Sequence, residues 1–145
     1  MLDLKHVLLA TDLSEQCDQV AQAAFDIAKT CNATLSIVHV MEHSPIAYGG
    51  EFSIPIDVNL EQTLETHARE GLATLADKYN IPENNQHIES GSVKLGVVEL
   101  AIELKVDLIV VGTHGHHGMD LLLGSRANAI LHSTKCDVWV VRIKD

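Results

Sequence analysis

Short apolar runs alternate with longer amphipathic stretches along the whole of this chain. The runs are rich in Val, Ile and Leu, and polar or turn-forming residues follow them, which is typical of buried strands. Strands that alternate with helices require right-handed crossovers and a mostly parallel sheet. We therefore predict one doubly wound α/β domain over residues 1–145, with strands at residues 6–10, 35–40, 87–90, 108–111 and 138–141.

Helices are predicted in the segments between these strands. Ser14 is expected to cap the first helix and Ser92 the third, because a serine hydroxyl can accept a hydrogen bond from a free helical N–H. A long loop at residues 41–57 separates the second strand from a second helix over residues 60–79, and a short fourth helix spans residues 127–131. The apolar face of the first helix has spacings of four, three and four, and its residues are Val20, Ala24, Ile27 and Cys31.

Composition narrows the class of protein. Apolar residues make up 46% of the 145 residues and aromatic residues only 3%, so the core is aliphatic, as suits layered α/β packing. A net charge of −10 disfavours binding to nucleic acid. No apolar run reaches membrane-spanning length and no signal peptide is evident, so we predict a cytoplasmic protein with no membrane partner.

A glycine-rich loop lies between the predicted strand at residues 108–111 and the last helix. Glycine reaches positive φ and lets a ligand approach the backbone, and the N–H groups at the start of the next helix attract anions. Phosphate is therefore the expected occupant. The alternative is a connection whose glycines only satisfy turn geometry, but the pair Gly124-Ser125 at the helix start favours phosphate.

Thr11 and Asp12 follow the first strand, just as Gly112 follows the fourth. Ligands of open parallel sheets bind beyond the carboxyl ends of strands, where the strand order reverses. If these two strands are neighbours, the two segments face each other across one crevice. Asp12 would suit a ribose there, because an ionised carboxylate only accepts hydrogen bonds. Its alternative role is to cap the first helix.

Taken together, these residues resemble the universal stress protein family. Nucleotide-binding members of that family carry Gly-x-x-Gly, nine residues, and then Gly-Ser or Gly-Thr. Here Gly112-Thr113-His114-Gly115 and Gly124-Ser125 match in type, with eight residues between them. The first, second, fourth and last strands also match, so the resemblance covers essentially the whole chain. It implies a Rossmann-like sheet of order 3-2-1-4-5 and an adenine nucleotide, ATP or AMP with or without Mg²⁺, between the first and fourth strands.

The resemblance also implies roles for individual residues. Asp12 would lie near adenine or ribose and the Val40 backbone near the adenine edge, with Val111 and Gly112 against the ribose. The glycines, Ser125 and the Arg126 amide would hold phosphates. The full predicted binding set is Thr11, Asp12, Val40, Val111, Gly112, His114, Gly115, Gly124, Ser125 and Arg126. A homodimer through the last strand, from Val138 to Val141, is implied as well; core packing is the alternative role for Trp139.

Three functions are open at this point. The first is a cytoplasmic stress-response regulator that binds adenine nucleotide. The second is a dimeric interaction module with a vestigial pocket that holds no nucleotide. The third is an enzyme, which is disfavoured because the chain has no Gly-x-x-x-x-Gly-Lys-Ser/Thr loop and no Lys or Arg inside its glycine loop; weak ATPase activity or autophosphorylation stays open. His114, His116 and His117 are disfavoured as metal ligands, because no Cys or carboxylate stands at zinc-site spacing.

Overall fold

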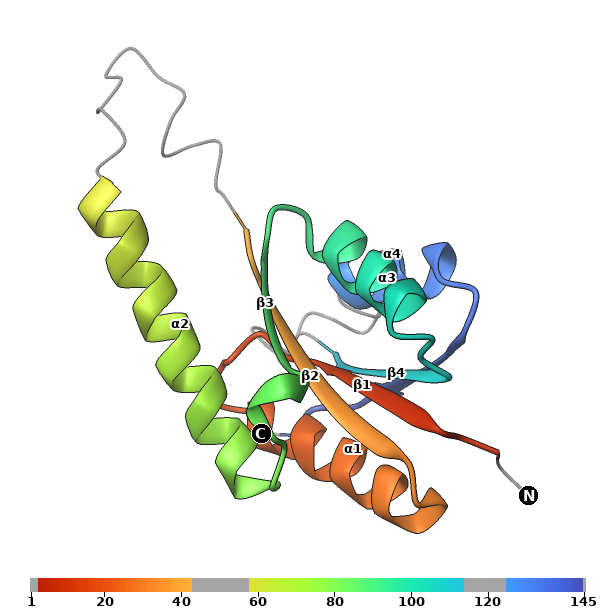
Figure 1. The fold of residues 1–145 in the computed structure, drawn as a ribbon. Helices are drawn as coiled ribbons and strands as arrows, with labels where there is room; N and C mark the ends of the chain where they lie inside the picture. The colour runs from red at the N-terminus through yellow and green to blue at the C-terminus, as the bar shows by residue number, and fades with distance from the viewer. Residues whose placement is uncertain (1–2, 43–57, 114–124, 145) are drawn as a thin grey trace.

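Strands and helices alternate along the chain in the computed structural model (Figure 1). It describes residues 3–42, 58–113 and 125–144. At the start of the second and third segments only the backbone is described, and the side chains are described from residues 62 and 127 onwards. In chain order the elements are β1 (His6–Ala10), α1 (Cys17–Cys31), β2 (Thr34–Met41), α2 (Val58–Lys78), the 3-10 helix η2 (Glu83–Asn85), β3 (Gln86–Ser90), α3 (Val93–Glu103), β4 (Leu108–Gly112), α4 (Ser125–Ser133) and β5 (Asp137–Val141).

The strands form one parallel sheet with the order β3-β2-β1-β4-β5. The predicted fold class and strand order are both confirmed. β1 is the central strand: Leu9 lies opposite Ile37 of β2 on one side and Val110 of β4 on the other. The chain therefore builds outward from β1 to β3 and then crosses back to the other side of β1. The chain leaves β1 towards α1 on one face of the sheet and β4 towards α4 on the other, so the carboxyl ends of these two strands lie at the point where the strand order reverses.

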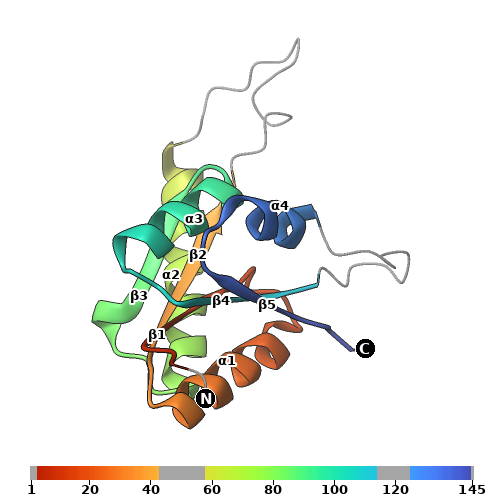
Figure 2. The same ribbon diagram turned by 90° about the vertical axis from the view of Figure 1, so that its right-hand side faces the viewer.

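Two aliphatic cores lie on the two faces of the sheet. Figure 2 shows α3 and α4 on one side of the strands and α1 on the other. Val7 and Leu9 of β1 point into the core with α1 and α2, whereas Leu8 points into the core with α3 and α4. All three β1 side chains have 0% exposure, because the strand is covered on both faces and paired on both edges. Such burial explains why the strands read as continuous apolar runs.

The two predicted N-caps differ in outcome. Ser92 caps α3 as predicted, since its hydroxyl accepts a hydrogen bond from the Leu95 N–H at 3.3 Å. The prediction for Ser14 is wrong, because α1 begins at Cys17 and its N-cap, Gln16, makes no side-chain capping bond. Ser14 lies instead in a turn in which its N–H donates a hydrogen bond to the Asp12 carboxylate.

The amphipathic face of α2 is buried only over its C-terminal turns. Leu72 and Leu75 have exposures of 2% and 4%, whereas Leu64 on the same face is 51% exposed. The helix has 21 residues and spans about 30 Å, while the five-residue strand β3 that follows it spans about 17 Å. Its N-terminal turns therefore extend past the sheet, as Figure 1 shows.

Candidate functional site

A cavity of about 400 Å³ lies beyond the carboxyl ends of the central strands. The paired strands β1 and β4 bring Thr11 and Asp12 to one side of it and Gly112 to the other. Aliphatic side chains from both cores form most of its described wall. The described lining residues are Ala10, Thr11, Asp12, Cys17, Val20, Val38, His39, Val40, Met41, Glu42, Leu64, Ala68, Val93, Val97, Val111, Gly112, Thr113, Ala127, Ile130 and Ile143.

The turn after β1 is held by side-chain bonds to its own backbone. The Thr11 hydroxyl accepts a hydrogen bond from the Leu13 N–H at 3.0 Å, and Asp12 Oδ1 accepts one from the Ser14 N–H at 2.9 Å. Leu13 has a φ of 57°, in the left-handed region that a bulky residue seldom adopts. Because these bonds close the turn before α1 begins, Asp12 is not the N-cap of that helix.

His39 joins this turn to β2. Its ring Nδ1 lies 2.9 Å from the carbonyl oxygen of Thr11. A carbonyl can only accept, so Nδ1 carries the hydrogen in this pair. His39 was not among the predicted site residues, yet the structure places it in the cavity wall. The available sequence signal was its position near the end of the second strand.

Gly112 ends β4 in a crowded place. A β carbon built there would lie 2.6 Å from Cγ2 of Val20 and 3.0 Å from Cδ1 of Ile143. Thr113, the next residue, binds the C-terminal segment through two hydrogen bonds. Its N–H donates to the Val141 carbonyl, and its hydroxyl accepts from the Ile143 N–H. The absence of a side chain at Gly112 thus lets α1 and the C-terminal segment pack against β4.

Cys17, the first residue of α1, also lines the cavity. Burial raises the pKa of its thiol above the ordinary value, and the negative charge of Asp12 raises it further. A hydrogen bond with the Thr11 side chain offsets part of this rise in pKa. The thiol is therefore kept in its protonated, weakly nucleophilic form at neutral pH.

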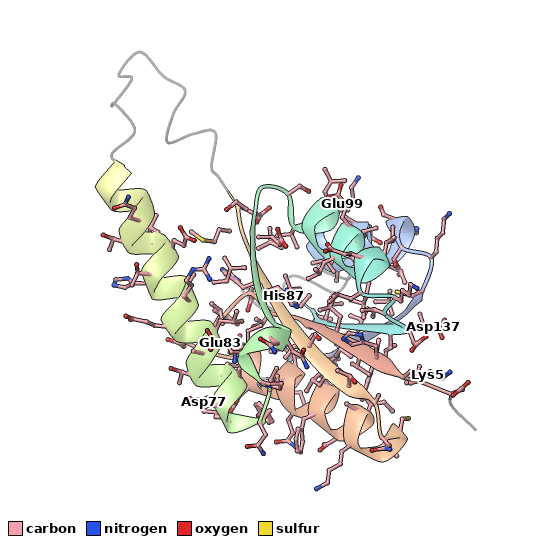
Figure 3. The ribbon with its side chains drawn as sticks, in the orientation of Figure 1. Lys5, Asp77, Glu83, His87, Glu99 and Asp137 are labelled. Carbon is pink, nitrogen blue, oxygen red and sulfur yellow. The ribbon has the colours of Figure 1, made fainter. Side chains whose placement is uncertain are left out.

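The described cavity wall is apolar and acidic. Its charged residues are Asp12 and Glu42, and no Lys or Arg is found among the described lining residues. The remaining negative charge is spread over the molecule: Figure 3 labels Asp77 on α2, Glu99 on α3 and Asp137 on β5. Within the described part of the chain, no group of three or more His, Cys, Asp or Glu could hold a metal ion.

These features suit a ligand with an apolar ring and hydrogen-bond donors. Aliphatic side chains can cover the faces of a ring, while carboxylate and carbonyl oxygens accept from hydroxyl or amino groups. Val40 and Val111 belong to this wall and are 6% and 4% exposed. The described residues are therefore suited to a nucleoside more than to its phosphates.

The structure brings together the predicted residues that it describes at the strand ends: Thr11, Asp12, Val40, Val111 and Gly112 all line the cavity. Ser125 and Arg126 form the first turn of α4, and their side-chain surroundings are not described. His114, Gly115 and Gly124 lie outside the described residues. Cavity residues that were not predicted include Leu64 and Ile143, whose apolar character gave no signal that distinguished them from core residues.

Comparison with known proteins bears directly on this site and fold. The sequence profile of the Universal stress protein family matches residues 3–142. The chain belongs to the universal stress protein family. This membership confirms the resemblance drawn from the glycine motifs and the strands.

Universal stress protein A homolog 1 of Coxiella burnetii is 59% identical to this chain over 141 residues, which cover 97% of the chain and 98% of the relative. Among solved structures, universal stress protein UspA from Lactobacillus plantarum has a TM-score of 0.79 at 22% identity, covering 98% of this chain and 100% of that one. A universal stress protein crystallised in complex with cAMP has a TM-score of 0.70 at 24% identity, covering 97% and 98% of the two chains. These structures share the fold of this universal stress protein.

None of the helices in the described part of the chain has the length and apolar character needed to cross a membrane.

Proposed function

We propose that this chain binds an adenine nucleotide in the cavity beyond β1 and β4 and acts as a stress-response regulator, not as a dedicated enzyme. The observation that carries the proposal is the convergence of Thr11, Asp12, Val40, Val111 and Gly112 on one cavity. These residues come from three separate segments and were predicted from their positions at strand ends and from the family resemblance. A universal stress protein of the same fold in complex with cAMP supports the same class of ligand.

Each part of the nucleoside contacts a different set of cavity residues. Val40 and Val111 cover the base and sugar with aliphatic surface, and the Asp12 carboxylate accepts from a ribose hydroxyl. The phosphates belong to the predicted loop glycines and to Ser125 and the Arg126 amide in the first turn of α4. Backbone N–H groups at a helix start are free to bind an anion.

Direct binding tests the proposal. The protein is unfolded, freed of any nucleotide that co-purifies, refolded, and titrated calorimetrically with adenosine, AMP, cAMP, ATP and GTP, each with and without Mg²⁺. We expect saturable binding of at least one adenine compound and weaker binding of GTP. Absence of adenine binding, together with no nucleotide in the material released on unfolding, would favour the dimeric interaction module with a vestigial pocket.

We also propose that the chain forms a homodimer through β5. This strand lies at one end of the sheet, where its outer edge has no partner strand among the described residues. Unpaired strand edges attract further strands, and pairing with a copy across a twofold axis satisfies both edges. Trp139, which is 39% exposed on this strand, supplies the largest apolar surface available there.

A further inference from the structure

β2 clamps Thr11, the residue before Asp12, on both sides of its α carbon. The Thr11 N–H donates to the Val38 carbonyl at 3.0 Å, which extends the β1–β2 pairing by one residue. The carbonyl of the same Thr11 accepts from the His39 ring at 2.9 Å. Thr11 itself is only 8% exposed, so these bonds are shielded from competing water.

This clamp acts on Asp12 through the planarity of the peptide bond. The Thr11 carbonyl belongs to the peptide that joins Thr11 to Asp12, and the atoms of that unit lie in one plane. Fixing its oxygen therefore fixes the Asp12 N–H and α carbon. At the other end, Oδ1 of the Asp12 carboxylate accepts from the Ser14 N–H at 2.9 Å. A carboxylate has about four lone-pair sites, so a bond from the Ser14 N–H does not by itself prevent a bond from a ligand.

We propose that His39 is the positioning residue of this site, because its ring holds the Thr11 carbonyl and thereby sets the Asp12 carboxylate where it meets the ribose hydroxyls. This inference rests on the proposed function. It assigns to His39 a part in ribose recognition without contact between its ring and the ribose. The turn after Thr11 contains Leu13, whose φ of 57° lies in a region that a bulky residue seldom adopts.

The test separates ribose recognition from general stability. Adenosine carries both ribose hydroxyls, and 2′,3′-dideoxyadenosine carries neither but keeps the base. A hydrogen bond to a charged acceptor contributes enough that the wild-type protein is expected to prefer adenosine by about tenfold or more. The His39→Ala variant is expected to bring this preference close to one while changing the affinity for dideoxyadenosine less than about threefold.

Two further variants make the test specific. His39→Asn keeps an amide N–H near the position of Nδ1, so it is expected to restore most of the preference for adenosine. Asp12→Asn is expected to lose the preference as His39→Ala does, and the double variant to lose no more than either alone, since the two residues act on one contact. His87→Ala on β3 is the matched control, because His87, labelled in Figure 3, is not among the residues that line the cavity.

Each result of these titrations has its own meaning. Equal weakening of both ligands in His39→Ala, with the preference intact, would overturn the inference and leave His39 a structural residue. The inference also fails if His39→Asn does not restore a preference that His39→Ala has lost. Failure of wild-type protein to bind either nucleoside would instead reject the proposed function.

Discussion

Gly112 and Gly71 differ in what surrounds the place where a β carbon would stand. At Gly112 that atom would lie 2.6 Å from a methyl group of Val20, a distance that real β carbons do not tolerate. At Gly71, within α2, the nearest atom is Cδ1 of Leu13 at 3.5 Å, which is an ordinary contact. One glycine therefore relieves crowding, and the other only weakens its helix.

Replacing each glycine by alanine should change stability in opposite directions. Gly112→Ala is expected to destabilise the fold by about 1–3 kcal/mol, because it overpacks the junction of β4 and α1. Gly71→Ala is expected to stabilise it by about 0.5–1 kcal/mol, because alanine loses less backbone entropy in a helix. Urea unfolding measures both, and a stabilised Gly112→Ala protein would contradict the crowding described at β4.

Cys17 offers a chemical probe of the cavity that needs no mutation. Its raised pKa predicts slower alkylation by iodoacetamide at pH 8 in the folded protein than in the urea-unfolded chain. Saturating adenosine should slow the reaction further, because Cys17 lines the cavity. Cys31 and Cys136 do not line it and serve as internal controls in peptide mass analysis. Equal protection of all three thiols would indicate general stabilisation and not occupancy of the cavity.

At the scale of elements, α1 and the end of α2 are joined by Tyr79. Its ring lies 5.5 Å from that of Phe25, and its hydroxyl donates to Asp18 Oδ1 at 3.0 Å. Burial, followed by the Asp18 hydrogen bond and charge, raises the pKa of Tyr79 to about 12. The protonated phenol is thus favoured in the folded state.

This shift in pKa predicts how stability depends on alkaline pH. The contribution of Tyr79 is fully present below its unfolded pKa of about 10 and is lost as pH rises towards 12. Relative to Tyr79→Phe, the wild-type protein should therefore lose free energy of unfolding between these pH values. Urea unfolding of both proteins at several pH values from 9 to about 12 measures the difference, which cancels the titration of the other groups. A constant difference would mean that folding does not raise the pKa of the Tyr79 phenol.

Trp139 tests the proposed pairing of β5 across a dimer axis. Val138 and Val140 pack against the core with α3 and α4, so a charge at either would disturb folding as well as assembly. Trp139 is the cleaner position because it is partly exposed in the single chain. We expect Trp139→Glu to shift the mass in light scattering from dimer to monomer while circular dichroism stays unchanged. A dimer of unaltered stability would place the interface elsewhere.

The elements themselves were largely predictable from the sequence, because β1, β2, β4 and β5 are compact apolar runs. The exception is β3, in which Ile88 is the one aliphatic residue. The capping role predicted for Ser14 failed, because residues 15 and 16 form a turn, closed by the Cys17 N–H on the Ser14 carbonyl, before α1 begins at Cys17. The strand-end part of the cavity followed from motifs. The bond from His39 and the contribution of Ile143 did not, because both depend on which side chains face each other after folding.

At the scale of the whole molecule, a ligand that binds only the folded state stabilises it by mass action. At a concentration of one hundred times Kd the gain is about 2.7 kcal/mol, which for a domain of this size raises Tm by about 5–10 °C. ATP or AMP with Mg²⁺ should produce this rise in nucleotide-free protein, and GTP a smaller one. Gly124→Val should remove most of it, because a branched side chain blocks approach of phosphate to the backbone. A melting curve unmoved by millimolar nucleotide would reject adenine binding.

The central position of β1 has a consequence for biosynthesis. The strand made first receives its second neighbour, β4, only after roughly 100 further residues have been translated, which takes about 5–20 s at typical speeds of elongation. During that interval the edge of β1 that β4 will occupy is open, and Leu8 and Val38 lack the cover of α3 and α4. Ribosome-associated chaperones that shield apolar surface are therefore most needed by this chain between the emergence of β3 and that of β4.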